Sequence, residues 1–348
     1  MAPILRALSD QKIEYNYIST GQHKDTMDAI LSCFKIKTPD YILYRGKDIT
    51  SIIKMFIWAI SIIFTTIKDR KKIFKNDRNG IVLVHGDTFS TLLGAIIGKI
   101  GSLKVAHIES GLRSYNLFHP FPEEITRLIT FKLSDYLFCP GDLAINNLKN
   151  YSAIKINTHH NTLVDALELA LPEIKKSIKI DLPHEPYVIV TLHRFENIKN
   201  NTAITRLIKL VDIIAKEHKI LFILHKPTEI KLKKFGYYQQ LKKNKNIEFR
   251  QRYDYFKFIK LIIHAKFIVS DGGSNQEECY YLGKPIILLR QATERKEGLG
   301  ENCILSKYDC KIVKYFSQNF SKYKRQPQSL LLSPSLLIVK AIEKFNKS

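Results

Sequence analysis

The stretch GIVLVHGDTFSTLLGAIIGKIGSLKVAHIES, Gly80 to Ser110, indicates the fold of this chain. It begins with a short apolar run rich in β-branched residues, Ile81–His85, and continues through a helix-length amphipathic segment, Thr88–Ile100. It ends in a second apolar run, Lys104–Ile108. Short runs that are apolar on both faces are typical of parallel strands covered by helices. The stretch therefore predicts a strand–helix–strand unit within a parallel sheet.

The same alternation continues along the chain. Further strand candidates are Tyr15–Ser19, Tyr136–Cys139, Tyr187–Leu192, Ile220–Leu224, Phe267–Ser270 and Pro285–Leu289, and helical segments such as Leu163–Lys176 and Thr202–Glu217 lie between them. Strands that alternate with helices predict an α/β fold with doubly wound parallel sheets. Two prolines within residues 177–186 follow a helix and precede a strand, which indicates a boundary. We expect two Rossmann-like domains, residues 1–176 and 177–335. A C-terminal helix is expected at 336–348, and packing against the first domain is one arrangement open to it.

The composition narrows the class of protein. The 348 residues are 45% hydrophobic, which is enough for two domains with cores. The five cysteines show no C-x-x-C pair and no histidine at metal-ligand spacing, and the N-terminus carries no secretory signal. These features favour reduced thiols and a cytoplasmic location.

The formal net charge of +22 has two interpretations. Lysine-rich solvated surfaces explain most of it, and a few positions are available to bind a nucleotide. Because the sequence has no zinc finger, aromatic RNA-binding pair or basic helical stripe, we expect no nucleic-acid partner.

One apolar segment raises the question of a membrane. The uncharged run Met55–Ile67 is 13 residues long, whereas a spanning helix needs about 20. We expect a buried helix and no span. The basic residues Lys68–Lys72 that follow leave a peripheral membrane contact open.

Acidic side chains follow two predicted strands. Asp87 comes shortly after Ile81–His85, and Glu109 comes directly after Lys104–Ile108. The carboxyl ends of parallel strands meet at one edge of a sheet, where ligands bind. The loop HPFPEEITR then returns Glu123 at the start of a helix. We expect the three carboxylates to converge, which raises the pKa of one of them and creates an acid/base pair.

A structural interpretation of these acids competes with the catalytic one. Glu109 and Glu123 would then only cap helices or pair with Arg113 and Arg127. This interpretation is stronger for Glu123, because acidic residues are common in the first turn of a helix. It is weaker for Asp87 and Glu109 together at two strand ends.

The second half of the chain offers a histidine and a glycine loop. The strand in YVIVTLHRFEN ends near His193 and Arg194, which suit acid/base chemistry or phosphate contact, although a lone histidine is more often structural. In SDGGSNQEE a strand ends at Ser270, and Ser274 and Glu277 are expected to form a capping box that opens a helix. A helix N-terminus behind glycines can bind anions, although the same residues also fit an ordinary turn into a capped helix.

Several signatures are missing from the sequence. There is no G-x-G-x-x-G, no Walker GKS or GKT and no G-x-S-x-G. No cluster of carboxylates, cysteines or histidines has metal-ligand spacing. The sequence therefore predicts neither a metal nor a redox cofactor.

Seven segments together resemble those of bacterial UDP-N-acetylglucosamine 2-epimerases. They occur in the order VLVHGDTFSTLLGA, HIESGLRS, PFPEEITR, NTLVDAL, TLHRFEN, SDGGSNQEE and LGKPIILLRQATERKEG, and the resemblance runs from Met1 to about Asp309. It implies two Rossmann-type domains of the glycogen-phosphorylase and glycosyltransferase-B kind, with a UDP-sugar in the cleft between them and a homodimer as the assembly. It also implies that Asp87, Glu109 and Glu123 are the catalytic carboxylates and that His193 is the cleft histidine.

The resemblance implies further contacts. Substrate-binding residues are expected at Arg113, Arg127, Arg194, Gly273, Ser274, Gln276, Glu277, Glu278 and Arg295. An allosteric UDP-sugar site is implied at Gln22, His23 and His225. The chemistry implied is proton abstraction at C2 with anti-elimination of UDP, followed by re-addition of UDP with the opposite C2 configuration, or by addition of water.

The sequence departs from the family pattern at three places. The family begins with a strand and a G-T-R-P-E loop ahead of the helix that reads here as MAPILRAL, so the first strand is expected to be missing. The usual D-S-G-G-x-Q-E-E reads D-G-G-S-N-Q-E-E, and P-V-H-x-N-P reads ILHKPTE.

Other activities stay open at this point. Within the family, they are a hydrolysing enzyme that releases N-acetylmannosamine and an enzyme acting on a modified sugar. Outside it, they are a UDP-sugar glycosyltransferase and an inactive nucleotide-sugar-binding homologue.

Overall fold

The structure is a computed structural model that describes residues 1–22, 24–46, 49, 52–117, 122–176, 178–328 and 332–347. The chain divides into two compact units, which we describe separately. Unit 1 contains Met1–Ala166 and Leu332–Ser348, and unit 2 contains Leu167–Leu331. The division falls within α7, Leu163–Lys176. The domain ranges expected from the sequence stay a prediction.

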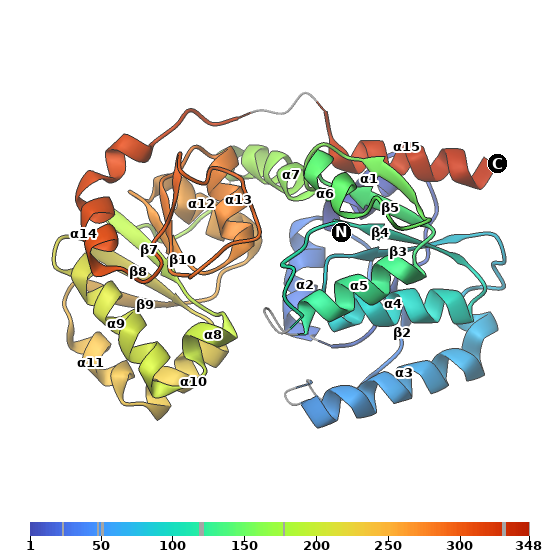
Figure 1. Ribbon diagram of the computed structural model, residues 1–348, viewed down its shortest axis with the longest axis horizontal. Coiled ribbons are helices and arrows are strands. Elements are labelled where there is room, and N and C mark those ends of the chain that lie inside the picture. The colour runs from blue at the N-terminus through green and yellow to red at the C-terminus, as the bar shows by residue number, and fades with distance from the viewer. Residues whose placement is uncertain are drawn as a thin grey trace. The chain divides into compact units, whose positions relative to one another are not determined.

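Unit 1 alternates helices with short strands (Figure 1). Its elements ahead of α7 are α1 (Ala2–Asp10), β1 (Ile18–Ser19), α2 (Lys24–Cys33), β2 (Tyr41–Ile42), α3 (Ile52–Ile73), β3 (Ile81–His85), α4 (Phe89–Ile100), β4 (Lys104–Ile108), α5 (Glu123–Leu133), β5 (Tyr136–Cys139), α6 (Asp142–Asn147) and β6 (Ile154–Asn157). The strands β3-β4-β5-β6 form a parallel sheet in that order, and β1 pairs with β2 in a separate parallel sheet. Among the described residues, no strand joins β1 to β3.

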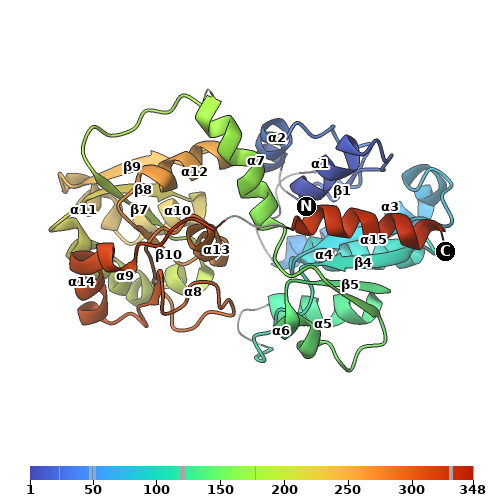
Figure 2. The ribbon, with the colours of Figure 1, turned by 90° about the horizontal axis from the view of Figure 1, so that it is seen from above.

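The last helix of the chain belongs to unit 1. It is α15, Pro334–Lys347, and it lies beside α1 (Figures 1 and 2). Ile4 and Leu8 of α1 share one buried core with Ile338 and Ile342 of α15. The backbone N–H of Ser335 also donates to Asp165 over 2.7 Å. A helix was expected near this end of the chain, and burial of its apolar face against α1 fixes where it lies.

Unit 2 carries a single six-stranded parallel sheet among its described residues. Its elements after α7 are β7 (Tyr187–Thr191), α8 (Phe195–Ile198), α9 (Asn201–Ala215), β8 (Lys219–Leu224), α10 (Lys226–Lys234), α11 (Tyr237–Lys243), β9 (Ile247–Gln251), α12 (Tyr255–His264), β10 (Ile268–Ser270), α13 (Gly273–Tyr281), β11 (Ile286–Leu288), β12 (Cys303–Leu305), α14 (Cys310–Asn319) and the 3₁₀ helix η1 (Phe320–Tyr323). The strand order is β9-β8-β7-β10-β11-β12. Counted within the unit, this is the 3-2-1-4-5-6 order of a Rossmann fold.

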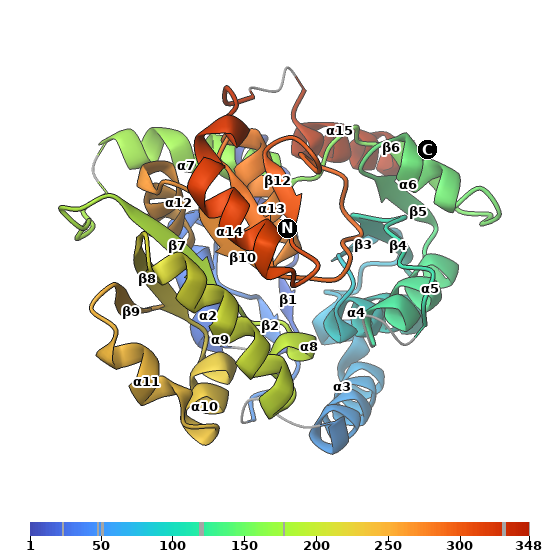
Figure 3. The ribbon, with the colours of Figure 1, turned by 60° about the vertical axis from the view of Figure 1, so that its left-hand side comes forward.

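Helices α9 and α14 cover one face of this sheet (Figure 3). Val188 and Val190 of β7 and Phe222 of β8 pack there against Val211 of α9 and Phe316 of α14. All five residues of β7 are buried, as expected for a strand with both faces covered. The two α/β units with parallel sheets confirm the predicted fold class.

Helix α3 contains the apolar segment that raised the membrane question. Trp58, Ala59 and Ile62 are buried, whereas Phe64 and Ile67 on the other side of the helix are exposed. Among the described residues, no helix is long and apolar enough to cross a bilayer.

Candidate active site

The strands β3 and β4 end side by side in unit 1. Their register pairs His85 with Ile108, the last residue of each strand. Asp87 lies two residues beyond the end of β3, and Glu109 lies one residue beyond the end of β4. The two acids therefore leave the same edge of one parallel sheet.

Glu109 is held in a defined place. Its backbone has φ of +64°, in the left-handed region that non-glycine residues rarely adopt and that is common at functional sites. The side-chain amide of Asn161 donates to Oε1 of Glu109 over 2.6 Å, and Nδ1 of His85 lies 4.0 Å from Oε2. The Glu109 side chain is 12% exposed, so it is partly accessible. Contacts of Asn161 and His85 with Glu109 were not predicted from the sequence, although Asn161 is the first residue of the segment NTLVDAL.

A single hydroxyl connects Asp87 to Glu123. The Oγ1 of Thr126 on α5 lies 2.5 Å from the backbone oxygen of Asp87 and 2.8 Å from that of Glu123. Glu123 is the first residue of α5. Because both backbone oxygens contact one atom, the two acidic residues are neighbours. Asp87, Glu109 and Glu123 are thus brought to the same end of the unit 1 sheet.

Glu124, for which no role was predicted from the sequence, binds two arginines. It is 0% exposed, and it accepts hydrogen bonds from Nε of Arg113 over 2.5 Å, from the backbone N–H of Ser114 over 3.0 Å and from Nη1 of Arg127 over 3.3 Å. The Nη2 of Arg127 donates to Asp87 over 2.5 Å. Arg113 therefore pairs with Glu124, and Arg127 bridges Glu124 and Asp87.

A buried histidine supports the turn that carries Asp87. Nε2 of His107 donates to the backbone oxygen of Gly86 over 2.7 Å. Burial lowers the pKa of His107 to about 4, so the ring is neutral at physiological pH. Gly86 has φ of +76°, a conformation that suits glycine. The turn is thereby fixed without adding a charge beside the carboxylates.

In unit 2, His193 and Arg194 follow β7, and Asp271 follows the neighbouring strand β10. The register pairs Thr191 with Ser270, so these residues leave the same sheet edge. Asp271 accepts the backbone N–H of His193 over 3.0 Å and that of Arg194 over 3.0 Å. His193 and the three carboxylates belong to different units, and its expected position facing them stays a prediction.

The predicted capping box is wrong. Helix α13 begins at Gly273, its N-cap is Gly272, and no side chain caps it. Ser274 lies inside the first turn and is exposed. Glu277 is buried and forms an ion pair with Nη1 of Arg295. The strong ion pair available to Glu277 explains why its side chain does not turn back to the helix start.

Gln276 anchors the loop that follows β11. Its amide nitrogen donates to the backbone oxygens of Arg295 and Glu297 over 3.2 and 2.9 Å, and its amide oxygen accepts from Thr293 over 2.9 Å. A Cβ added at Gly273 would lie 2.9 Å from Nε of Arg295, so this glycine lets the arginine approach the start of α13. Direct substrate contacts by these residues stay a prediction.

Glu294 joins two arginines at the ends of two strands. It lies 3.2 Å from Nη2 of Arg194 and 2.8 Å from Nη2 of Arg290. Burial alone would raise the pKa of Glu294, but the guanidinium groups of Arg290 and Arg194 lower it to about 2. Nε and Nη1 of Arg290 are buried with no hydrogen-bond partner within the part of the chain that the structure describes. Two donor nitrogens of a buried cation are therefore unsatisfied within the described residues.

Glu278 lies inside unit 2 near Asn275, whose amide donates to it over 2.9 Å. Burial raises the pKa of Glu278 to about 7, although hydrogen bonds from Asn275 and Tyr255 and the charge of Arg295 oppose the rise. Because the folded value exceeds the ordinary 4.5, this residue makes unit 2 less stable as the pH rises from about 4.5 to about 7.

The variant Glu278→Gln tests this effect of burial. It is expected to remove the contribution of Glu278 to the pH dependence and to exceed the wild type in free energy of unfolding at pH 8 by up to about 3 kcal/mol. Urea denaturation at pH 5 and pH 8 measures it, and the exposed Glu301→Gln serves as the matched control. A difference in free energy of unfolding between the variant and the wild type that is the same at pH 5 and pH 8 would contradict the assignment.

The expected allosteric residues divide between the units. Gln22 of unit 1 accepts from Ser90 over 2.6 Å, and His23 lies outside the described residues. His225 of unit 2 follows β8 and stacks on His193, with ring centroids 4.6 Å apart. The structure therefore places His225 in contact with a predicted catalytic residue, and its allosteric role stays a prediction.

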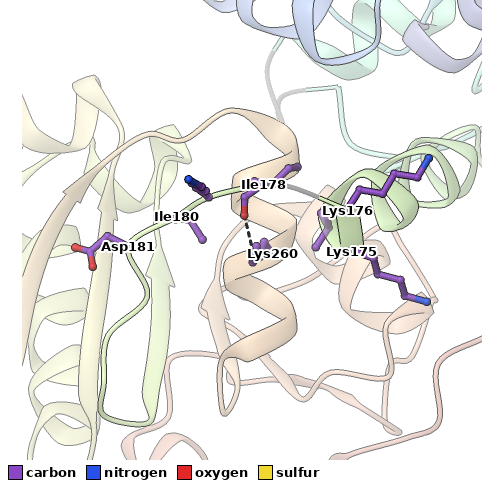
Figure 4. Close-up of a pocket in the computed structure, with 8 residues that line it drawn as sticks. Lys175, Lys176, Ile178, Ile180, Asp181 and Lys260 are labelled. Atoms are coloured by element: carbon purple, nitrogen blue, oxygen red, sulfur yellow. Dashed lines mark hydrogen bonds between the residues drawn. The ribbon is translucent and has the colours of Figure 1, made fainter.

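A basic pocket in unit 2 is separate from these residues. It has a volume of about 640 Å³ and lies between the end of α7, residues 178–181 and α12 (Figure 4). Nζ of Lys260 donates to the backbone oxygen of Ile178 over 2.6 Å, so this lysine supports the chain. Because none of the predicted site residues lines the pocket, it is not the candidate active site.

The chain matches known proteins over most of its length. The family model described as UDP-N-acetylglucosamine 2-epimerase matches residues 6–330. The chain belongs to this family. The UDP-N-acetylglucosamine 2-epimerase of Methanocaldococcus jannaschii is 33% identical over 333 residues, covering 90% of this chain and 87% of that protein. That of Neisseria meningitidis is 32% identical over 320 residues, covering 87% and 82%.

Solved structures of family members share the fold. The M. jannaschii enzyme in complex with UDP-GlcNAc and UDP has a TM-score of 0.82 at 27% identity, covering 99% of this chain and 95% of that one. The N. meningitidis enzyme bound to UDP-GlcNAc has a TM-score of 0.81 at 27% identity, covering 99% and 96%. These likenesses confirm the family named from the sequence. Its members occur in archaea as well as bacteria, so the family alone does not make this chain bacterial.

Proposed function

We propose that this family member interconverts UDP-N-acetylglucosamine and UDP-N-acetylmannosamine for the synthesis of surface polysaccharide. The observation that carries the proposal is the gathering of Asp87, Glu109 and Glu123 at one sheet edge. Epimerisation at C2 needs a base for the C2 proton and an acid or base that acts on the other face of the sugar. Carboxylates held by different partners suit such a division of tasks.

The reaction proceeds by elimination and re-addition. A carboxylate takes the C2 proton while the C1–O bond to UDP breaks, which gives 2-acetamidoglucal and UDP. UDP then re-forms the C1–O bond, and a proton is delivered to C2 on the opposite face. The product is an isomer of the substrate, so no atoms are gained or lost.

The second task is to stabilise the departing diphosphate. In unit 2, Arg290 is 4% exposed and keeps two buried donors without a partner among the described residues. Glu294 links Arg194 to Arg290, and Arg295 pairs with Glu277 of α13. Guanidinium groups suit phosphate oxygens because they donate several hydrogen bonds in a fixed plane. We place the UDP part of the substrate at these arginines.

Incubation with UDP-N-acetylglucosamine, followed by proton NMR, tests the proposal. The expected product is UDP-N-acetylmannosamine. Free N-acetylmannosamine with UDP would instead identify a hydrolysing enzyme, and turnover only of a modified sugar would identify a different substrate. Transfer to an acceptor without C2 inversion would indicate a glycosyltransferase, and UDP binding in calorimetry without turnover would indicate a binding protein.

A cytoplasmic location accompanies this proposal. Cys139, Cys279, Cys303 and Cys310 are free thiols, which is typical of a reducing compartment.

We propose that two copies of the chain pair through α3. Ile57, Ile60, Phe64 and Ile67, which we call the α3 seam, are 64%, 58%, 73% and 61% exposed. Their spacing of three, four and three residues is the a/d pattern of paired helices. The largest contiguous apolar patch on a typical monomer measures about 300–600 Å² and is often functional, whereas a stable interface buries about 800 Å² on each partner. The α3 seam therefore suits the centre of an interface between helices, with more polar residues around it.

The effect of salt on binding distinguishes a second copy of the chain from an acidic membrane as the partner of α3. Lys54 lies one turn before Ile57 and Lys68 lies one turn after Phe64, so these two exposed lysines border the α3 seam ahead of the break in the helix at Asp69. Two copies bring like charges together at the rim, so the dimer is expected to tighten as salt screens them. Attraction to an acidic bilayer would weaken with salt.

Sedimentation of the protein at about 50 and 500 mM NaCl measures this difference. The wild type is expected to be a dimer that tightens with salt, and Phe64→Lys is expected to be a monomer. Ile230→Lys, at an apolar residue of α10 that is 55% exposed, is the control and is expected to stay a dimer. A monomeric wild type that sediments with acidic vesicles at low salt would contradict the pairing.

A further inference from the structure

Asp271 is a buried carboxylate beside His193 that accepts hydrogen bonds from three residues. It is 0% exposed. Its oxygens accept the backbone N–H of His193 over 3.0 and 3.1 Å, the backbone N–H of Arg194 over 3.0 Å and the side-chain amide of Asn197 over 2.9 Å. The group thus fixes the start of the loop that follows β7 and the short helix α8.

The same carboxylate faces one particular nitrogen of the His193 ring. Oδ1 of Asp271 lies 3.4 Å from Nδ1 of His193, at the long end of the hydrogen-bonding range. An ionised carboxylate can only accept, so the nitrogen that faces it carries the proton. Nε2 of the neutral ring then keeps its lone pair.

Two other contacts restrict the ring. His225 stacks on His193 with an interplanar angle of 25°, and Nε2 of His225 lies 3.1 Å from Oγ1 of Thr191. A Cβ added at Gly272 would lie 3.1 Å from Cε1 of His193, so the ring edge lies against the backbone that opens α13. The His193 side chain is nevertheless 39% exposed, which leaves part of the ring accessible.

We propose that Asp271 is a positioning residue that holds the His193 ring with Nε2 free to exchange a proton with the substrate. Asp271 itself does not touch the substrate in this account. The proposal rests on the proposed function for its catalytic consequence. The ring orientation can be measured without any activity.

The charges around the ring set the expected pH effect. The groups that face it are Asp271 after β10, Arg194 and Glu196 on its own loop, Arg252 after β9 and His225 after β8. Burial lowers the pKa of His193, Asp271 opposes that effect, and Arg194 and Arg252 add to it. Burial, with His193 and Arg252, lowers the pKa of His225 to about 3, so His225 is neutral at physiological pH. Removing the charge of Asp271 therefore lowers the pKa of His193 further.

The variant Asp271→Asn keeps the size of the side chain and removes its charge. The expected result is a loss of about 10²-fold in kcat, since an amide can donate to Nδ1 and stabilise the wrong tautomer. UDP affinity measured by calorimetry is expected to stay within about threefold, and the limb of the kcat/KM profile that reports His193 is expected to move to lower pH. Asp254→Asn, which removes an acid that caps α12 through the N–H of Lys257, is the matched control.

A second measurement is independent of whether the variant folds. Two-bond ¹H–¹⁵N spectra of the wild-type imidazoles at pH 8, assigned with His193→Gln, report which ring nitrogen carries the proton. The expected tautomer has Nδ1–H and a bare Nε2. A wild-type His193 protonated at Nε2, or a folded Asp271→Asn with kcat within threefold of the wild type, would overturn the proposal. The expected tautomer in a protein without epimerase activity would leave the positioning intact and reject the proposed function.

Discussion

Replacing Glu109 by glutamine is expected to abolish epimerisation, with a loss of about 10³-fold or more in kcat. Proton transfer by a placed side chain contributes typically about 10²–10⁴-fold, and an amide cannot take a proton from carbon. Glu109 is held by Asn161 and lies at a left-handed backbone position at the end of β4. The amide of Asn161 therefore holds one oxygen of this carboxylate in place.

The binding of UDP separates lost chemistry from lost structure. Because the arginines proposed for the diphosphate lie in unit 2, Glu109→Gln is expected to bind UDP as the wild type does. Glu14→Gln, at an exposed acid of the same unit, is the matched control and is expected to keep full activity. A Glu109→Gln protein with more than a tenth of the wild-type kcat would remove this residue from the mechanism.

Replacing Glu124 by glutamine is expected to produce the largest loss of stability. The change removes the buried negative charge that pairs with Arg127, which is 5% exposed, and with Arg113. Removing one member of a buried ion pair costs about 3–5 kcal/mol. Activity is expected to fall as well, because Arg127 also contacts Asp87. Urea denaturation followed by circular dichroism measures the free energy of unfolding.

The pH dependence of the wild type gives an independent check on Glu124. Burial would raise the pKa of Glu124, but the N–H of Ser114 and the guanidinium of Arg113 lower it below the ordinary 4.5. Its contribution is therefore present above pH 4.5 and is lost as the pH falls through the lower folded value. Glu229→Gln, which breaks an exposed pair with Lys233 on α10, is the control and is expected to cost about 0.3–0.5 kcal/mol. Equal losses of free energy of unfolding in Glu124→Gln and Glu229→Gln would contradict the account of Glu124.

The central strands could be predicted because they are buried on both faces. The ranges given for β3, β4 and β5 agree with the structure residue for residue. Four strands were not predicted from the sequence, and each lies at the edge of a sheet: β2, β6, β9 and β12. In β6 and β9, polar residues interrupt the apolar run because one face or edge is open to solvent, so the simplest signal is lost.

The site residues likewise divide into those that could be predicted from the sequence and those that could not. Asp87 and Glu109 could be placed together because parallel strands end at one edge. The same rule applies to Asp271 after β10, but DGG was interpreted as a turn ahead of a helix, and the Asp271 carboxylate was given no role. Glu124 was missed because its neighbour Glu123 carried the resemblance and no short-range pattern marks a pair with Arg113. The capping box failed because a tertiary ion pair with Arg295 outweighs a local cap for Glu277.

The fate of the C2 proton tests the central claim most directly. The protein is incubated with UDP-N-acetylglucosamine in D₂O, and the C2 position is followed by proton NMR. If carboxylates of the Asp87–Glu109–Glu123 site exchange the C2 proton, the C2-inverted product carries deuterium at C2, and Glu109→Gln gives no such product. A C2-inverted product that keeps its original hydrogen, or inversion that continues undiminished in Glu109→Gln, would contradict the account.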